Sequence, residues 1–290
     1  MRVAIAGARG FLGSHLAARL VADGHETVGI ERDAYPRTIA SWCPDALVYA
    51  GGPSHNVERL TATEAGACLG EWTAILDAAV VAGARHVILL SSHAVYGPSD
   101  RNHEEDEAPA PRTLYGALQA SREHIGMAFH HSKGLPFTSL RLATVYGPGM
   151  RPDALVRVFL DAALSGGEIR LEGGGAQIRP FVHIDDAVAR IASALYRHAF
   201  LEPFPDDSAG RTFNVVTDHD TIASLASLTM AAAVNLGRPG CRLITTEPRT
   251  AEVGHVRMSP TGGTIGDRLH PAIELKDGIP ATARAMLEGR

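Results

Sequence analysis

Three glycines near the beginning of the chain, Gly7, Gly10 and Gly13, have the spacing of residues that bind a dinucleotide. They lie between the apolar segment RVAIAG and leucines that recur at helical spacing, which predicts a strand, a glycine-rich turn and a helix in that order. Gly7 would permit the tight turn, Gly10 would let the backbone approach a pyrophosphate, and Gly13 would let helix and strand pack closely. Because amides at a helix N-terminus face such phosphates, we also assign Phe11 and Leu12 to the cofactor site.

An acidic residue at the end of the next expected strand indicates which dinucleotide binds. Glu31 lies 18 residues after Gly13, where a carboxylate can accept hydrogen bonds from a ribose 2′-hydroxyl. This position favours NAD as the cofactor. Arg32, which we include in the cofactor site, and Arg37 leave NADP open, because a guanidinium turned toward the ribose can bind a 2′-phosphate.

The elements that must position these residues alternate between apolar strands and amphipathic helices. Continuous apolar strands separated by helices predict a parallel sheet covered on both faces, a Rossmann-like doubly wound α/β fold with a small C-terminal substrate lobe. We expect strands at 2–7, 26–31, 46–52, 86–92 and 136–142, and helices over 12–21, 72–80, 153–165 and 185–197. At the end of the third strand, Ala50 and Gly51 are also assigned to the cofactor site.

The predicted fold has two parts and one unusually short connection. We predict that residues 1–150 form mainly the dinucleotide-binding domain, interleaved with part of 175–220, and that 151–290 form mainly the substrate-binding lobe. Only 14 residues separate Glu31 from the next clear strand at Ala46, enough for one crossover and no additional strand. In a doubly wound sheet the missing strand would lie on the adenine side, so we expect a shallow adenine pocket and weaker cofactor binding.

Composition limits the classes of partner. The chain has 290 residues, a net charge of -5 and no long basic run, so we expect a small-molecule substrate and no nucleic acid. Its three cysteines are widely spaced and indicate neither a disulfide framework nor a zinc site, so we expect reduced thiols, a cytoplasmic location and no metal. The first residues run directly into an apolar strand, and we expect neither an export signal nor a membrane span.

Several further segments, taken in order, resemble the extended short-chain dehydrogenase/reductase family. Within it they are most similar to the NAD-dependent epimerase/dehydratase group, which acts mostly on nucleotide sugars. The segments are GARGFLG at 7, SSHAVYG at 91, YGALQ at 115, RLATVYGPG at 141, RPFVHIDDA at 179 and FNVV at 213.

The resemblance implies roles for individual residues. Ser92 falls on the family's catalytic Ser or Thr, which holds the substrate oxygen, and Tyr115 falls on its proton-transferring tyrosine. Gln119 occupies the position of the family's lysine, beside the nicotinamide ribose. Arg179 is similar to the arginine that contacts the sugar-nucleotide diphosphate, although it could instead pair with a following aspartate. Thr144 stands where the family usually has asparagine.

The missing lysine changes the chemistry expected of Tyr115. A cation beside a phenol stabilises the phenolate, and an amide has no net charge to do so. Gln119 can still hydrogen-bond a ribose hydroxyl, but we expect Tyr115 to stay protonated near neutral pH and to be a better acid than base.

Two histidines are candidates near the same site. His93 stands where dehydratases of this family carry an aspartate, while Ala94 replaces the neighbouring glutamate. His93 could titrate near neutrality and move protons, or it could be held by backbone hydrogen bonds. By the resemblance, His55 points toward the same cleft as a substrate-binding residue, and an exposed loop histidine is the alternative.

We therefore expect an NAD(P)-dependent epimerase or ketoreductase that acts on a nucleotide-linked sugar or a related hydroxylated metabolite. Two alternatives remain at this stage. One is a cofactor-impaired relative that only binds a ligand, and the other isomerises or eliminates by proton transfer without net hydride transfer. The resemblance also implies a homodimer, formed through the helices near 64–82 and 115–131.

Overall fold

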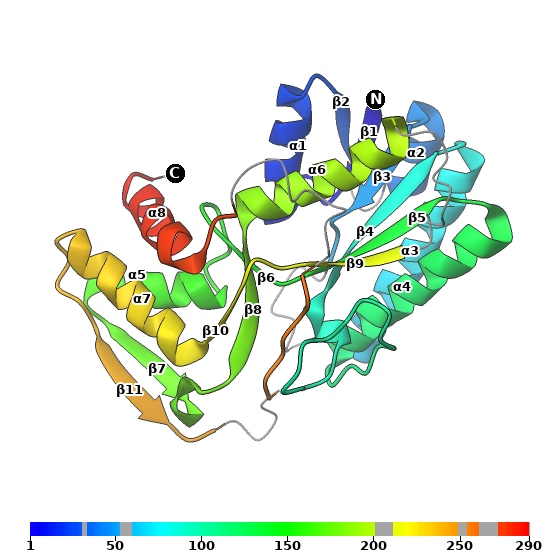
Figure 1. The fold of residues 1–290 in the computed structure, drawn as a ribbon. Coiled ribbons are helices and arrows are strands. Elements are labelled where there is room, and N and C mark those ends of the chain that lie inside the picture. The colour runs from blue at the N-terminus through cyan, green and yellow to red at the C-terminus, as the bar shows by residue number, and fades with distance from the viewer. Residues whose placement is uncertain (31–33, 53–59, 201–210, 249–253, 261–271, 290) are drawn as a thin grey trace.

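A six-stranded sheet forms the centre of the larger part of the protein (Figure 1). The computed structural model describes residues 1–30, 34–52, 60–200, 211–248, 254–260 and 272–289. All strand pairs in this sheet are parallel, in the order β2-β1-β3-β4-β5-β9. The strands are β1 Arg2–Ala6, β2 Glu26–Ile30, β3 Ala46–Tyr49, β4 His86–Ser92, β5 Phe137–Leu142 and β9 Arg211–Val215.

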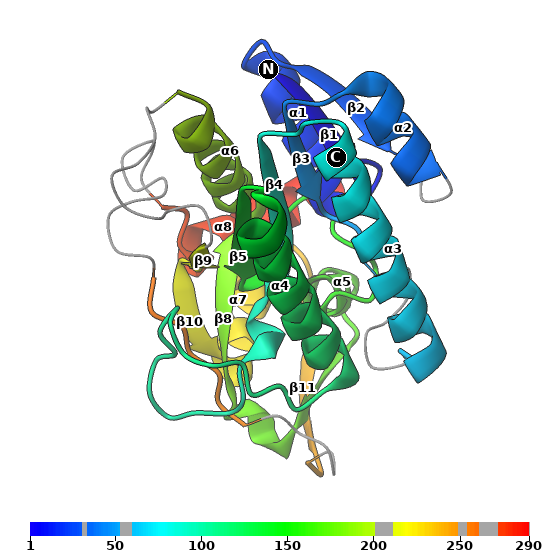
Figure 2. The same cartoon turned by 90° about the vertical axis from the view of Figure 1, so that its right-hand side faces the viewer.

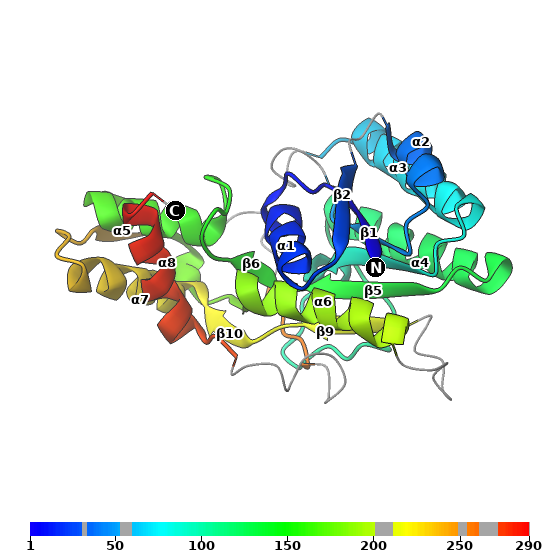
Figure 3. The ribbon, with the colours of Figure 1, turned by 90° about the horizontal axis from the view of Figure 1, so that it is seen from above.

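Helices cover both faces of this sheet, as Figure 3 shows from above. On one face lie α1 Phe11–Ala22 and α6 Ile184–Phe200, and on the other lie α2 Tyr35–Trp42, α3 Ala62–Val81 and α4 Leu114–Lys133. Every residue of β3 and β5 is buried, because a strand covered on both faces has no side in water. The predicted doubly wound α/β fold is confirmed.

The connection between β2 and β3 is as short as the sequence predicts. In the part of the chain that the structure describes, it contains one helix, α2, and β2 is the edge strand of the sheet. The helix packs against α3 and buries Tyr35 and Ile39 beneath it. The absence of a further strand at this edge among the described residues agrees with the expected loss of one strand.

The second half of the chain builds a smaller lobe and also returns to the large sheet. The lobe has its own apolar core, formed by three helices and two small sheets. Its elements are β6 Thr144–Tyr146, β8 Ile178–His183 and β10 Asp218–Thr221 in one sheet, β7 Glu168–Glu172 and β11 Arg242–Thr246 in the other, and α5 Leu155–Ser165, α7 Ile222–Asn235 and α8 Leu275–Leu287. Because β9 pairs with β5, the two halves are interleaved in space. The predicted domain boundaries stay a prediction.

Helices α3 and α4 lie side by side on the outer face of the sheet (Figure 2). Threonines begin both helices: Thr61 forms a capping box with Glu64, and the Thr113 hydroxyl accepts a hydrogen bond from the Gly116 amide at 3.0 Å. The cap at Thr113 places Tyr115 in the first turn of α4. These are the helices expected to form a homodimer, which stays a prediction.

Candidate active site

The glycine loop fits tightly between β1, α1 and the end of β3. Gly7 has a φ of +84°, and a Cβ atom there would stand 2.9 Å from the Ala50 carbonyl oxygen. At Gly13 a Cβ atom would stand only 2.2 Å from the Gly7 carbonyl oxygen. The structure therefore has both the tight turn expected at Gly7 and the close packing expected at Gly13.

The start of α1 is open to a phosphate. Gly10 occupies the cap position and has no side chain to bond the first amides of the helix, which begins at Phe11. Leu12 follows in the first turn, and Ala50 and Gly51 lie at the neighbouring end of β3. Most of the expected cofactor residues thus meet at the carboxyl ends of two adjacent strands, an arrangement that fits a bound dinucleotide. Glu31 and Arg32 lie outside the described residues.

Tyr115 and Ser92 share one large cavity with the residues expected to bind substrate. The cavity has a volume of about 1100 Å³ and lies between the large sheet and the lobe. Among its lining residues are Ser92, His93, Tyr115, Thr144 and Arg179. The structure therefore brings together residues from four motifs that lie far apart in the chain. His55 lies outside the described residues.

The Tyr115 phenol is held in its protonated form. Burial raises its pKa above the ordinary value, and the charge of Arg122 acts against this rise, as do hydrogen bonds with Ser92 and Gln119. The Gln119 amide nitrogen donates to the phenol oxygen at 3.3 Å. A phenol in this state carries the proton that a reduction needs, whereas acting as a base first requires its surroundings to help it lose that proton.

His93 does not titrate near neutrality. Burial, reinforced by the charge of Arg179, lowers its pKa to about 4, so the imidazole is neutral at pH 7. Its Nε2 lies 3.5 Å from the Thr144 hydroxyl, and its buried Nδ1 has no hydrogen-bond partner among the described residues. The expectation that His93 titrates near neutrality is therefore corrected. The alternative, a ring held by backbone hydrogen bonds, is not observed at its Nδ1 atom either. The reason is the desolvation that packing imposes on the ring.

Two other predicted residues have definite contacts. The Ser92 hydroxyl accepts a hydrogen bond from the Ala94 amide at 3.1 Å, which begins the short 3-10 helix His93–Val95. Arg179 donates to the Gly254 carbonyl at 2.7 Å and to the Ile178 carbonyl at 3.0 Å. These bonds hold the Arg179 side chain beside the cavity that it lines.

Sequence reasoning missed Arg122, a cation next to Gln119. Its guanidinium is fully buried on the inner face of α4, and it donates to the Gln119 amide oxygen at 3.0 Å. The available signal was the segment QASRE, which places Gln119, Arg122 and Glu123 on one side of a helix by its three- and four-residue spacing. Glu123 is also buried and pairs with Arg141 at 2.8 Å.

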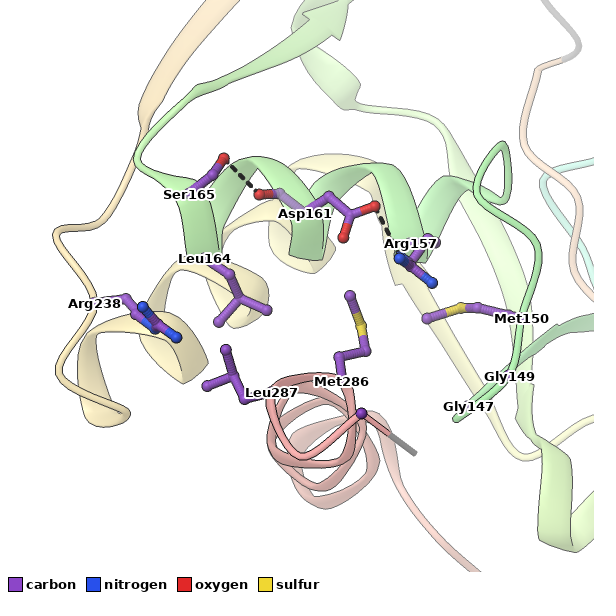
Figure 4. A pocket seen from close by; sticks show the side chains of 11 residues that line it. Gly147, Gly149, Met150, Arg157, Asp161, Leu164, Ser165, Arg238, Met286 and Leu287 are labelled. Atoms are coloured by element: carbon purple, nitrogen blue, oxygen red, sulfur yellow. Dashed lines mark hydrogen bonds and ion pairs between the residues drawn. The ribbon is translucent and has the colours of Figure 1, made fainter.

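A second cavity, of about 440 Å³, lies between α5 and α8 of the lobe (Figure 4). Two of its polar side chains have partners on α5: Arg157 pairs with Asp161 at 2.8 Å, and the Ser165 hydroxyl donates to the Asp161 backbone carbonyl at 2.7 Å. Of the predicted catalytic residues, Ser92, His93 and Tyr115 line the larger cavity instead, whereas Gln119 does not line it and contacts Tyr115 through a hydrogen bond. We therefore place the chemistry in the larger one.

Comparison with known proteins identifies the family. A family model described as the NAD dependent epimerase/dehydratase family matches residues 3–215. The chain belongs to this family. NAD is the cofactor that the family description names, which agrees with the predicted cofactor.

Several relatives of this chain bear the names of enzymes that act on nucleotide sugars. The chain is 30% identical over 229 residues to a probable UDP-glucuronate 4-epimerase of Rhizobium meliloti, covering 66% of this chain and 67% of that protein. It is 29% identical to a dTDP-glucose 4,6-dehydratase of Streptomyces griseus, over 72% of this chain and 60% of that protein. The fold matches the UDP-glucose 4-epimerase of Thermus thermophilus, solved with NAD, with a TM-score of 0.85 and 22% identity over 100% of both chains.

Two features are absent from the part of the chain that the structure describes. In the described ranges, no cluster of three or more His, Cys, Asp or Glu side chains could hold a metal ion. None of the helices in those ranges is long and apolar enough to cross a membrane.

Proposed function

We propose that this family member is an NAD-dependent 4-epimerase of a nucleotide-linked sugar, with a uronic acid as the preferred sugar. The observation that carries the proposal is that Tyr115 and Ser92 line the same cavity as Arg179. A relative at 30% identity bears the name probable UDP-glucuronate 4-epimerase, and a neighbour in fold was solved with UDP-glucuronic acid and NAD. These names support the same class of substrate.

The residues of the cavity divide the work of such a reaction. Bound NAD would supply a hydride acceptor and then a hydride donor. Ser92 would hold the reacting hydroxyl of the sugar, while Tyr115 would take its proton during oxidation and return it during reduction. The Arg179 guanidinium suits the diphosphate, because a planar fork binds phosphate oxygens in pairs. The net reaction inverts one carbon, and no hydride or proton is gained or lost.

Positive charge near Tyr115 supports a substrate with a carboxylate on its sugar. Arg112 and Arg151 line the cavity together with Tyr115. The charge of Arg151 acts to lower the pKa of the Tyr115 phenol, against the effect of burial. Arg151 also pairs with Asp153, which lines the same cavity, at 3.3 Å. Arg112, Arg151 and Arg179 suit a substrate with several negative charges, in a cavity that the carboxylates Asp153, Glu168 and Glu172 also line.

The direct test is to incubate the purified protein with UDP-glucuronate and with UDP-glucose and to follow inversion at C4 by NMR. We expect faster turnover of UDP-glucuronate and its loss in Tyr115→Phe, with folding checked by circular dichroism. Arg151→Gln should raise KM for UDP-glucuronate more than for UDP-glucose. Wild-type turnover in Tyr115→Phe would refute the assignment of the proton-transferring residue.

A ketoreductase on a keto sugar is the second candidate, and the raised pKa of Tyr115 favours it, because a protonated phenol suits reduction. The two reactions differ in how the cofactor is used. Supplying the emptied protein with each nucleotide separates them: turnover with NAD and no net formation or consumption of NADH supports the epimerase, while stoichiometric consumption of NADH or NADPH supports the reductase. A protein that binds none of these nucleotides would be a ligand-binding relative without hydride chemistry.

A further inference from the structure

Arg122 is a fully buried cation one turn after Gln119 on α4. Its side-chain hydrogen bonds go to neutral acceptors in the described residues. They are the Gln119 amide oxygen at 3.0 Å, the Tyr49 hydroxyl at 3.0 Å, and the Gly51 and Cys68 carbonyls at 3.5 Å each. Because an arginine side chain stays charged at every pH at which proteins fold, the positive charge is present inside the protein and acts over several ångströms.

The contact with Arg122 decides which way the Gln119 amide faces. A guanidinium only donates hydrogen bonds, so it selects the amide oxygen of Gln119 and leaves the amide nitrogen for other acceptors. That nitrogen points to the Tyr115 phenol oxygen at 3.3 Å and to the Leu90 carbonyl at 3.4 Å. Gln119 therefore donates to the phenol oxygen, the direction that stabilises a phenolate.

Arg122 is itself fixed on the side away from Gln119. The Tyr49 hydroxyl accepts from Arg122 and donates to the Glu71 carboxylate at 2.9 Å, and the guanidinium carbon lies 4.9 Å from the centre of the Tyr49 ring. The Gly51 carbonyl belongs to the end of β3 where the cofactor residues meet. The cation is thus anchored between the sheet, α3 and α4 on the inner side of the site.

We propose that Arg122 is a positioning residue that replaces the missing lysine: through Gln119 it supplies the positive charge and the hydrogen-bond direction that allow Tyr115 to give up its proton. The position of the charge has moved one turn along α4, and Gln119 links it to the phenol. This inference rests on the proposed role of Tyr115 in proton transfer. It accounts for how the site can oxidise a substrate although residue 119 carries no charge and His93 is a weak base.

The acidity of residue 115 itself tests the proposal without any substrate. Incorporating 3,5-difluorotyrosine at position 115 gives a more acidic phenol whose ionisation can be followed by 19F NMR, with and without NAD. Other titratable or charged side chains that face this phenol stay unchanged in the comparison; they are His93 from the 3-10 helix, Cys68 from α3, Arg112 before α4 and Arg151 before α5.

In Arg122→Met we expect the titration midpoint to rise by about one pH unit, because a buried charge has been removed. Arg122→Lys should keep most of the wild-type midpoint, and adding Gln119→Lys to Arg122→Met should lower the midpoint again. The control is Arg85→Met, which removes an exposed cation paired with Asp45 and should leave the midpoint unchanged.

An unchanged midpoint in folded Arg122→Met would overturn the proposal and leave Arg122 with a structural role only. Should that variant not fold, Gln119→Met interrupts the link between Arg122 and Tyr115, and its midpoint must rise as well; an unchanged midpoint there also overturns the proposal. The proposed epimerase activity can fail independently, because the titration of residue 115 requires no turnover of UDP-glucuronate.

Discussion

Replacing Gln119 by lysine would bring two positive charges together inside the protein. The Gln119 amide oxygen is 3.0 Å from the Arg122 guanidinium, and both side chains are buried. A lysine ammonium directed at Tyr115 would lie about 4 Å from the guanidinium, where two unit charges repel by about 4 kcal/mol at an effective dielectric constant near 20. We therefore expect Gln119→Lys to lower the free energy of unfolding by about 3 kcal/mol.

A double-mutant cycle measures this repulsion directly. Urea unfolding at pH 7 of wild type, Gln119→Lys, Arg122→Met and the double variant gives the coupling energy between the two positions. We expect the double variant to be more stable than the sum of the single changes predicts, by about 3 kcal/mol. Gln119→Met has a similar length without the charge and serves as the control: its coupling with Arg122→Met reports only the lost hydrogen bond, so the difference between the two couplings isolates the charge repulsion.

The reasoning would be refuted by stability losses that simply add. Additivity would mean that the ammonium and the guanidinium do not interact, and therefore that Arg122 is too far from the phenol side of Gln119 to influence Tyr115. Strong coupling would instead show that lysine at 119 and arginine at 122 are alternative ways to place one charge in this site.

Three further predictions follow from other parts of the molecule. Gly13→Ala, whose added methyl would stand 2.2 Å from a backbone oxygen, should abolish NAD binding and destabilise the fold by about 1–3 kcal/mol. Gly70→Ala, in open space on α3, is the control and should leave both NAD binding and stability intact. Calorimetric titration with NAD compares the two variants, and equal binding by both would contradict the packing argument. A hydrogen bond from the Glu104 amide is the largest of several interactions that lower the pKa of Glu107 to about 2, so its stabilisation is present above the unfolded pKa of 4.5 and is lost as the pH falls toward 2. The stability difference between wild type and Glu107→Gln should therefore shrink over that range in urea titrations, and a constant difference would count against it. The described connection from β2 to β3 holds a single helix, so we expect a shallow adenine pocket and a dissociation constant for NAD no tighter than micromolar. A sub-micromolar constant, measured by titration of the protein after bound nucleotide has been removed, would refute the shallow pocket.

The sequence by itself determined the fold class and the place of the cofactor loop. The periodicity of apolar residues is a local property, so strands such as 46–49 and helices such as 184–200 could be predicted to within a few residues. The glycine spacing has the same local character, because turn conformation and close packing at Gly7 and Gly13 depend on neighbours along the chain. The short connection after β2 could likewise be counted directly, and the motifs named the family.

Tertiary structure alone decided how the candidate site is charged. Nothing local to His93 indicates its burial beside Thr144 and Arg179, although that burial keeps the ring neutral. The contacts of Arg122 join α4 to residues at the end of β3 and on α3, more than fifty positions away in sequence. Desolvation and Coulomb interactions depend on distances between groups after folding, and such distances arise from the packing of segments that are remote in sequence. For that reason the sequence shows a lysine missing at position 119, and only the folded chain shows the cation that lies beside it.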